Sequence, residues 1–370
     1  MEFDRSAPGA GAEARCKLEN GKAFLEWRFH VKGDLLQTEI PGAQARRFGA
    51  GEGYTQSPRP VIRLSLMAGE GNVVAEGMQT VGEEEPLKTV LVQPRLWQGR
   101  RDPFLYEVEA TLTVQGACLD RIYTKLCLRE VHAGGAGEIL LNGQPLAVRA
   151  VSYSLPEGGS ETERRRQALS DFRTLLQLGA NSICVERKDQ RPFLSRLCDR
   201  FGILMFERGG LEGQDLLVCA WDGAVEISWG EEGQRERVPA YRGDSDAFFL
   251  AHRKCPTALY YKYKARWSEE PFVYLAPESV RRLRSGNYTV TCYSSCGRVA
   301  LYTDGELFEF RKGDGEFVFQ EVPARTPCIM LSAEGDGCSG ALSVHKSFVK
   351  SMDRDEGKMA SDLDKYAFPC

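Results

Sequence analysis

Three acidic residues gather just past an apolar run and could support acid–base chemistry. Glu207, Glu212 and Asp215 follow the apolar residues 203–206. Two carboxyl groups can share the roles of proton donor and nucleophile or base when their surroundings separate their pKa values. Solvated loop acids are far commoner than such pairs. We therefore predict no catalytic residue and keep these three as a residual acidic cluster.

Aromatic side chains offer a second kind of chemistry, because the apolar face of an indole can stack on a sugar ring. Trp267 is the strongest candidate for a surface contact, since charged and polar residues flank it. Trp221 and Trp229, in strand-like segments, come next. Trp27 and Trp97 lie in alternating patterns and are predicted to pack in a core. Carbohydrate binding is therefore expected, if anywhere, at Trp267, Trp221 and Trp229.

Cysteine and histidine form no complete metal-binding pattern. The nearest half-sites are C-x3-C at Cys292 and Cys296 and H-x2-C at His252 and Cys255, and neither has a second half. We predict reduced, buried thiols and no metal. No Gly-rich phosphate loop leads into a helix, so we also predict no cofactor.

The composition excludes several classes of function. A chain of 370 residues suits two or three domains, and 42% hydrophobic and 27% charged residues are typical of a globular protein. The net charge of −4 gives no support for binding nucleic acid or an anionic membrane. No apolar run has the length of a signal peptide or a membrane span, so we predict a cytoplasmic protein. The initial Met and the charged end favour a complete chain.

Short strands dominate the pattern on both sides of a different central region. Alternating runs separated by turn residues cover 22–132 and predict an antiparallel immunoglobulin-like sandwich. The same pattern returns from 215 and predicts a second sandwich, with 259–264 as one of its strands. In between, Asn142-Gly143 predicts a hairpin turn. Beyond that turn we predict helices at 160–178 and 191–200, strands at 182–185 and 203–206, and therefore a parallel β-α-β-α-β unit.

Four segments resemble the family 2 glycoside hydrolases, the β-galactosidase and β-glucuronidase type. They are residues 93–106 (QPRLW and DPFLY), 138–151 (a hairpin with NGQP), 171–207 (NSI and LCDRFGI) and 258–271 (ALYYKYKARWSEEP). In this family the third segment would form the first two units of a (β/α) barrel, and the fourth would introduce a C-terminal sandwich. The resemblance spans about 55–350.

The part of the family that does the chemistry has no counterpart here. A (β/α) barrel has eight units and about 250 residues, whereas only about fifty residues separate Phe206 from Ala258. The resemblance implies a catalytic Glu after an Asn on the fourth strand, and no Asn-Glu pair occurs in that gap. Retaining hydrolysis also needs two carboxyl groups about 5–5.5 Å apart. The family's polar positions in the matching units are replaced as well, since 150–154 read AVSYS and 184–189 read CVERKD.

These observations predict a mostly β protein with a small α/β part, in which two immunoglobulin-like β-sandwiches flank a truncated (β/α) barrel remnant. The expected domains are 1–135 (first sandwich), 136–257 (remnant), 258–350 (second sandwich) and a tail at 351–370.

A kept core with a lost site indicates a scaffold reused for another purpose. We therefore predict a non-catalytic structural or assembly protein. Two alternatives stay open: a carbohydrate-binding module without turnover, and a glycosidase whose site is rebuilt or completed by a partner subunit. The expected partners are a second copy or another protein, with a glycan as a further possibility.

Overall fold

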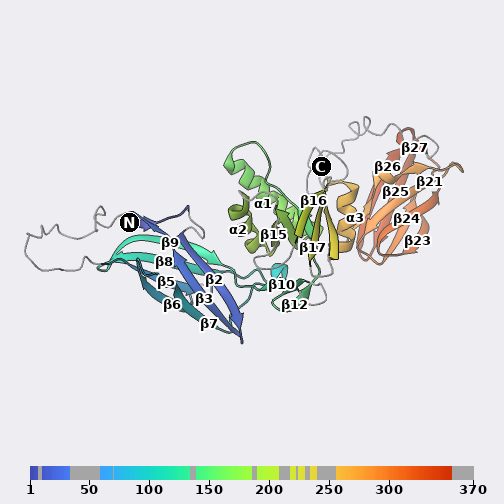
Figure 1. Ribbon diagram of the computed structural model, residues 1–370. Coiled ribbons are helices and arrows are strands. Elements are labelled where there is room, and N and C mark those ends of the chain that lie inside the picture. The colour runs from blue at the N-terminus through green and yellow to red at the C-terminus, as the bar shows by residue number, and fades with distance from the viewer. Residues whose placement is uncertain are drawn as a thin grey trace, which may run out of the picture. The chain divides into compact units, whose positions relative to one another are not determined.

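The computed structural model describes most of the chain and is mostly β, as the sequence predicts (Figure 1). The described residues are 1–6, 11–33, 59–69, 71–133, 139–185, 190–207, 217–221, 224–229, 234–239 and 256–351. The chain divides into two compact units. One unit joins Met1–Leu146 with Arg191–Leu204, and the other joins Ala147–Gln190 with Met205–Cys370.

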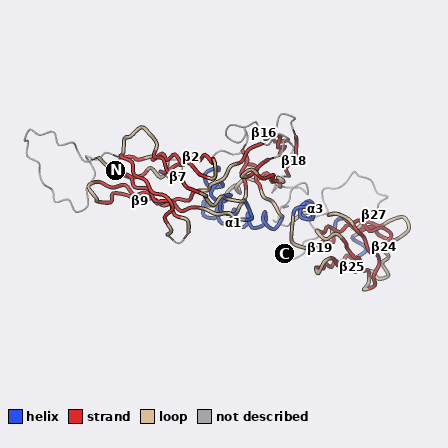
Figure 2. The backbone as a smooth tube through the Cα atoms, turned by 90° about the horizontal axis from the view of Figure 1, so that it is seen from below, coloured by secondary structure: helices blue, strands red, loops and turns tan. Residues whose placement is uncertain are grey.

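The first unit contains an antiparallel sandwich of two sheets, with strand orders β2-β3-β7 and β6-β5-β8-β9 (Figures 1 and 2). Its strands are β2 (Ala12–Glu19), β3 (Lys22–Phe29), β5 (Val61–Met67), β6 (Val73–Thr80), β7 (Leu87–Val92), β8 (Tyr106–Val114) and β9 (Ala117–Leu126). The short strands β1 (Glu2–Phe3) and β4 (Val31–Lys32) pair with each other.

Alternation along each strand builds the core of this sandwich. In β3 every second side chain is buried, and Trp27 at 1% exposure is the largest of them. Its indole N–H donates to Thr89 Oγ1 of β7 at 2.9 Å, which satisfies the one polar atom that this burial would otherwise leave without a partner. Residues of β8 alternate in the same way and face the same core.

A three-stranded sheet follows the sandwich and contains the predicted hairpin. It has the order β10 (Val131–Ala133), β11 (Ile139–Leu141) and β12 (Gln144–Leu146). Asn142 and Gly143 both have positive φ, 51° and 76°, as a two-residue type I′ turn requires. The predicted hairpin is confirmed.

The central strands form a sheet of order β13 (Ala150–Ser152), β14 (Ser182–Val185) and β15 (Leu204–Glu207), in which β13 and β14 run parallel. The helix α1 (Glu161–Leu178) begins at Ser160 with a reciprocal capping box to Glu163 and ends at Gly179 in the left-handed region. The helix α2 is Arg191–Phe201. These bounds agree with the predicted elements to within one or two residues.

Another antiparallel sheet follows in the chain. It consists of β16 (Leu217–Trp221), β17 (Ala224–Trp229) and β18 (Gln234–Pro239) in that order. The backbones of β17 and β18 lie against β13. All four residues of β14 are buried, so the small parallel sheet is covered on both faces within this chain.

The second sandwich pairs the sheet β19-β21-β20-β27, with β24 on β21, against the sheet β23-β22-β25-β26. Its strands are β19 (Val273–Leu275), β20 (Arg281–Arg282), β21 (Tyr288–Ser294), β22 (Arg298–Thr303), β23 (Glu306–Lys312), β24 (Gly315–Val322), β25 (Cys328–Gly335), β26 (Cys338–His345) and β27 (Lys350–Ser351). The sequence predicts strands here at 272–276, 288–293, 299–302, 317–322 and 328–332. It misses β23 and β26 as well as the short strands β20 and β27.

One predicted strand of this sandwich is wrong, because residues 259–264 lie in the helix α3 (Ala258–Trp267). The hydroxyl of Thr257 accepts a hydrogen bond from the Tyr260 backbone N–H and so caps the helix. The three tyrosines of this segment favour a strand. Packing of Tyr260 and Ala265 on the helix's buried side overrides that preference. Within the described residues, no helix is long and apolar enough to cross a membrane.

Candidate functional site

The acidic cluster predicted from the sequence is only partly placed by the structure. Glu207 is the last residue of β15, and its side chain lies outside the described part of the chain, as do Glu212 and Asp215. The cluster therefore stays a prediction.

A buried polar chain occupies the end of β13 instead. The Tyr153 hydroxyl donates to Asp171 Oδ2 at 2.9 Å, and Gln167 Nε2 donates to Asp171 Oδ1 at 2.9 Å. The Tyr153 ring meets Phe172 edge-on, with 5.7 Å between the ring centroids. Tyr153 and Asp171 are each only 1% exposed. Asp171 is thus buried on α1 and bound to Tyr153 and Gln167.

The sequence analysis did not predict the hydrogen bonds of Asp171, although the sequence holds a signal for them. Asp171 lies in the apolar stripe of α1, among Ala168, Phe172 and Leu175, which are all buried. A carboxyl group inside such a stripe must find hydrogen-bond donors when the helix packs. That requirement points to nearby donors such as Tyr153.

The first family-like segment and the end of α2 meet in a cluster that we call the first anchor: Trp97, Arg129, Asn142 and Asp199, with Gly99 and Gly202. The Trp97 indole N–H donates to the Asp199 carbonyl oxygen at 2.8 Å. Arg129 Nη1 lies 2.5 Å from Asp199 Oδ1, and its guanidinium lies 4.7 Å from the centre of the Trp97 ring. These contacts hold α2 on the first unit.

Electrostatics in the first anchor favour a charged Arg129. Burial alone would lower the pKa of Arg129, but the Cys127 sulfur and the Asp199 carboxylate outweigh it and raise that pKa. Burial raises the pKa of the Cys127 thiol to about 12. Cys127 therefore stays protonated at neutral pH and is a poor nucleophile.

Two glycines of the first anchor allow a close backbone approach. Gly202 has φ of 73°, and a Cβ placed on it would lie 2.5 Å from the Gly99 carbonyl oxygen. The Asn142 side-chain amide donates to the Trp97 carbonyl oxygen at 2.8 Å, and its oxygen accepts from the Glu130 N–H at 2.9 Å. The hairpin turn is thereby fixed to the Trp97 loop.

The second unit has an equivalent cluster that we call the second anchor: Arg149, Gly179, Asn181 and Trp267. Asn181 Oδ1 accepts from the Arg149 N–H at 2.7 Å, and its Nδ2 donates to the Ala147 carbonyl oxygen at 2.7 Å. The Arg149 side chain donates to the Trp267 carbonyl oxygen at 2.5 Å. A Cβ on Gly179 would lie 2.3 Å from that same oxygen.

The tryptophans fall into three groups. Trp27 and Trp97 are buried, as predicted. Trp267 is half-buried at the end of α3, with its ring edge-on to Tyr263 at 4.8 Å between the ring centroids. Trp221 and Trp229 end the strands β16 and β17, and their side chains lie outside the described residues. The predicted sugar-stacking role of the last three residues is not tested by these positions.

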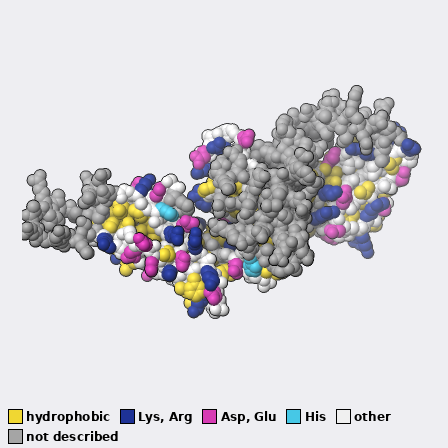
Figure 3. Space-filling model, viewed as in Figure 1, with side chains coloured by type: hydrophobic (Ala, Val, Ile, Leu, Met, Phe, Trp, Pro, Cys, Tyr) yellow, Lys and Arg dark blue, Asp and Glu magenta, His cyan; other side chains and the backbone are white. Residues whose placement is uncertain are grey.

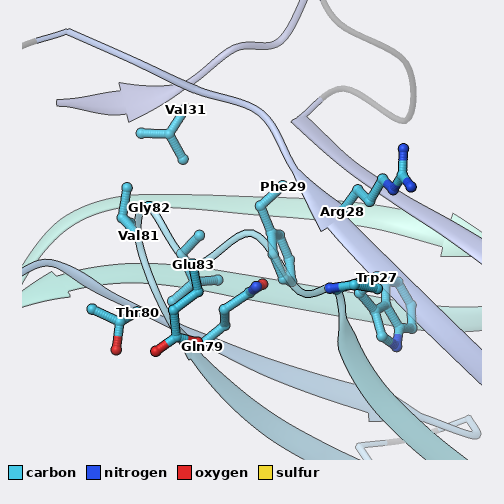
Figure 4. Close-up of a pocket in the computed structure, with 11 residues that line it drawn as sticks. Trp27, Arg28, Phe29, Val31, Gln79, Thr80, Val81, Gly82 and Glu83 are labelled. Atoms are coloured by element: carbon cyan, nitrogen blue, oxygen red, sulfur yellow. The ribbon is translucent and has the colours of Figure 1, made fainter.

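A small cleft opens in the first sandwich, at the end of β3 (Figure 4). Its volume is about 140 Å³, and Glu83 is the only acid in its lining. Ligand sites commonly measure about 300–1,000 Å³, so this cleft is smaller than a typical site for a sugar. Its lining is Trp27, Arg28, Phe29, Val31, Ile62, Gln79, Thr80, Val81, Gly82, Glu83 and Pro86.

Neither a metal site nor a basic patch stands out. Within the described ranges, no three His, Cys, Asp or Glu residues are grouped so that they could hold a metal. His252 and Cys255 lie outside those ranges. On the face drawn in Figure 3, basic and acidic side chains are interspersed.

Comparisons with known proteins confirm the resemblance to family 2 glycoside hydrolases. No protein-family model matches the chain. A Bacteroides fragilis β-glucuronidase is 30% identical over 122 residues, which are 32% of this chain and 17% of that protein. A Pectobacterium atrosepticum β-galactosidase is 28% identical over 38% of this chain and 14% of its own length. The chain thus matches less than a fifth of the length of these curated relatives.

Solved structures of similar fold cover nearly the whole chain. An FMN-binding β-glucuronidase from Faecalibacterium prausnitzii matches with a TM-score of 0.68 and 14% identity, over 96% of this chain and 76% of that one. A β-galactosidase-like protein from Bacteroides fragilis matches with a TM-score of 0.68 and 15% identity, over 95% and 75%. At such identities the likeness concerns the fold.

Proposed function

We propose that this chain is a non-catalytic scaffold built on the frame of a β-glycosidase, in which two sandwiches are carried by a folded βα element. The proposal rests on the packing contacts that the family-like segments make. Trp97 and Asp199 build the first anchor, and Asn181 builds the second. The recognisable segments therefore serve packing, and none of their described side chains forms a pair of carboxylates.

The end of β13 supports the same proposal. The family resemblance implies polar active-site residues at positions 152 and 154, where this chain has serines. Tyr153 between them is directed into the core and bonded to Asp171. The chain between β15 and α3 is about fifty residues long. That length cannot supply the remaining units of a barrel with eight βα repeats. Two carboxylates at the spacing of a retaining glycosidase would need a different frame.

Hydrolysis assays test the proposal directly. Full-length protein would be incubated with nitrophenyl β-glucuronide and β-galactoside, and we expect release of nitrophenol no faster than in buffer. Turnover that survives purification and is lost in Glu207→Gln, but kept in Glu161→Gln, would overturn the proposal. Glu161 is a suitable control because it is an exposed acid paired with Arg165 on the surface of α1.

We further propose that this scaffold assembles with a second protein chain through the outer edge of β15, with which no described strand pairs. The small parallel sheet needs no cover on its faces, because β14 is already buried. Among the described strands, however, none pairs with the outer edge of β15. An open strand edge can receive a strand from a partner. Light scattering on purified protein should give a dimer or larger species at micromolar concentration, and a clean monomer would exclude self-assembly.

Carbohydrate binding is the second candidate, favoured by the outer face of the sheet β23-β22-β25-β26. Phe310 is 56% exposed on this face, with the Arg298 guanidinium 5.8 Å from its ring centre. Tyr302 lies on the same face, held by its hydroxyl to Glu334 at 3.2 Å. Exposed rings on a flat sheet suit stacking on sugars. A glycan array should show binding that Phe310→Ala removes, and an array without hits would exclude this candidate.

A further inference from the structure

Two cysteines that are far apart in the sequence meet at one end of the second sandwich. Cys296 lies in the turn between β21 and β22, and Cys338 is the first residue of β26. Their sulfur atoms are 3.5 Å apart, close enough for one thiol to donate a hydrogen bond to the other. Both belong to the same compact unit.

The surroundings hold the pair in position. The Cys296 N–H donates to Ser294 Oγ at 3.0 Å, which fixes the turn. The Cys338 sulfur lies 2.8 Å from the Gly335 carbonyl oxygen. Gly335 also leaves room for its neighbour, because a Cβ at that position would lie 3.2 Å from the Cys296 sulfur. Only a modest rotation of the two side chains separates this contact from bonding distance, about 2.05 Å in a disulfide.

We propose that Cys296 and Cys338 form an oxidisable dithiol site, which closes to a disulfide when the protein meets an organic disulfide such as oxidised glutathione. Cys338 is half-exposed and Cys296 is buried, so Cys338 reacts first. Its thiolate attacks one glutathione sulfur, which forms a mixed disulfide and releases one glutathione. The Cys296 sulfur then attacks the Cys338 sulfur and releases the second glutathione. The oxidant takes up two electrons and the two thiol protons.

The pKa values of the thiols determine how fast the pair is oxidised. Burial and the neighbouring Cys296 together raise the pKa of the Cys338 thiol to about 11. A small thiolate fraction slows attack on a disulfide. The pair therefore stays reduced during brief exposure and closes under sustained oxidation. The bond would then join the turn before β22 to the first residue of β26 and enclose the strands β22–β25.

A third thiol makes a selective test possible. Cys292 is buried in β21, and its pKa is raised to about 12 by burial and by the nearby Cys296 and Cys338. It could compete for Cys296. Because Cys292 and Cys296 lie four positions apart along the same stretch of chain, a bond between them would close only a short loop and restrain the unfolded chain less.

The experiment uses full-length protein, reduced and then incubated with oxidised glutathione. Free thiols are alkylated, and the digest is analysed by mass spectrometry without reduction. We expect a linked peptide pair containing Cys296 and Cys338, and a rise in Tm of several degrees that dithiothreitol reverses. Cys292→Ser should keep both results, and Cys338→Ser and Cys296→Ser should lose both.

Other outcomes would overturn the inference. A link between Cys292 and Cys296, or glutathione remaining attached to Cys338 without closure, would show that the pair is not a dithiol site. Unchanged alkylation of all three thiols after prolonged oxidation would show the same. Circular dichroism of the Cys338→Ser protein checks that this half-exposed position tolerates the change, and the wild-type peptide map decides the question even if Cys296→Ser fails to fold.

Discussion

Each anchor fixes a family-like segment within its own unit, and the two anchors use different contacts to do so. In the first, side chains make the contacts, since an indole, a guanidinium and a carboxylate meet around the end of α2. In the second, the contacts converge on one main-chain oxygen, since Gly179 and the Arg149 side chain both approach the Trp267 carbonyl oxygen. Both anchors also contain an asparagine whose amide bridges two backbone groups.

This difference explains what the family-like segments preserve. The segments are recognisable by a tryptophan, an aspartate and two glycines at fixed spacing. Each of these residues occupies a position that few other residue types fit. None of these roles requires a substrate. A segment can therefore be retained for packing long after the catalytic part of a barrel has gone, and its presence is evidence of a fold rather than of an activity.

The largest expected loss of stability comes from adding a side chain where two backbone segments approach each other closely. Gly202→Ala would place a Cβ 2.5 Å from the Gly99 carbonyl oxygen, and Gly179→Ala would place one 2.3 Å from the Trp267 carbonyl oxygen. Both positions also have positive φ. We expect each change to reduce the free energy of unfolding by about 3–5 kcal/mol, measured by urea denaturation.

Gly143→Ala is the matched control for the two glycines. Gly143 has φ of 76°, but a Cβ added there would meet nothing within 4 Å, so only the backbone strain of about 1–2 kcal/mol should appear. Hydrogen exchange should assign the loss in Gly202→Ala to the first sandwich and that in Gly179→Ala to α3. Equal losses in all three variants would mean that backbone strain alone, and not the close approach, matters in both anchors.

The ion pair of the first anchor should give the next largest effect. Asp199→Asn leaves the Arg129 guanidinium without its charged partner, in a site where the two side chains are 25% and 22% exposed. Loss of one partner of a buried pair costs about 3–5 kcal/mol, and partial exposure reduces this to about 2–3 kcal/mol.

A double-mutant cycle sharpens that prediction. Arg129→Met removes the other partner, and the combined variant should recover part of the loss, because no uncompensated charge remains. Urea denaturation of the four proteins gives the coupling energy. If the two losses simply add, the 2.5 Å contact contributes nothing and the first anchor rests on Trp97, Asn142 and the glycines.

Much of this architecture follows from the sequence, and the exceptions have physical causes. The helix α1 is predictable because its start at Ser160, its apolar stripe and its stop at Gly179 agree. The helix α3 is mispredicted because its tyrosines favour a strand locally, while the cap from Thr257 and tertiary packing decide otherwise. Strand β23 is missed because its burial does not alternate regularly and a bulge shifts its register.

The site is less predictable than the fold. The short distance along the chain between β15 and α3, about fifty residues, can be read from the sequence, because it requires only counting residues. The Arg129–Asp199 pair cannot be inferred in this way, because 70 positions separate the two residues and neither lies in a charge pattern. The same holds for Cys296 and Cys338, which meet only because two turns of one sandwich lie together.

The two asparagines should show a smaller and nearly equal effect. Asn181→Ala removes one donor contact and two acceptor contacts, from the Arg149 N–H and the Ser182 hydroxyl, which should cost about 1–2 kcal/mol. In the first anchor the fair comparison is Asn142→Gly, because Asn142 has φ of 51° and alanine would add backbone strain. Thermal denaturation of both variants checks this. A loss in only one of them would show that only one anchor depends on its amide bridge.

The smallest effect concerns a carboxylate that neither anchor contains. Partial burial alone would raise the pKa of Asp120, but hydrogen bonds from Arg5 and from the Phe3 and Arg121 backbone lower it overall. A lowered pKa in the folded state stabilises the protein above the unfolded value of about 3.9, and this stabilisation is lost as the pH falls through the folded pKa.

Asp120→Asn should therefore cost no more than about 1 kcal/mol at pH 7, and the cost should shrink as the pH falls through the lowered pKa of Asp120, where the wild-type carboxyl becomes protonated as well. Denaturation of both proteins across this pH range measures the difference. In the second sandwich Glu321 has a pKa lowered by Ser285 and Asn287 but is fully exposed, so Glu321→Gln should leave the pH profile nearly unchanged. A larger change in the Glu321 variant would mean that the exposed contacts of the second sandwich carry more stability than the half-buried ones of the first.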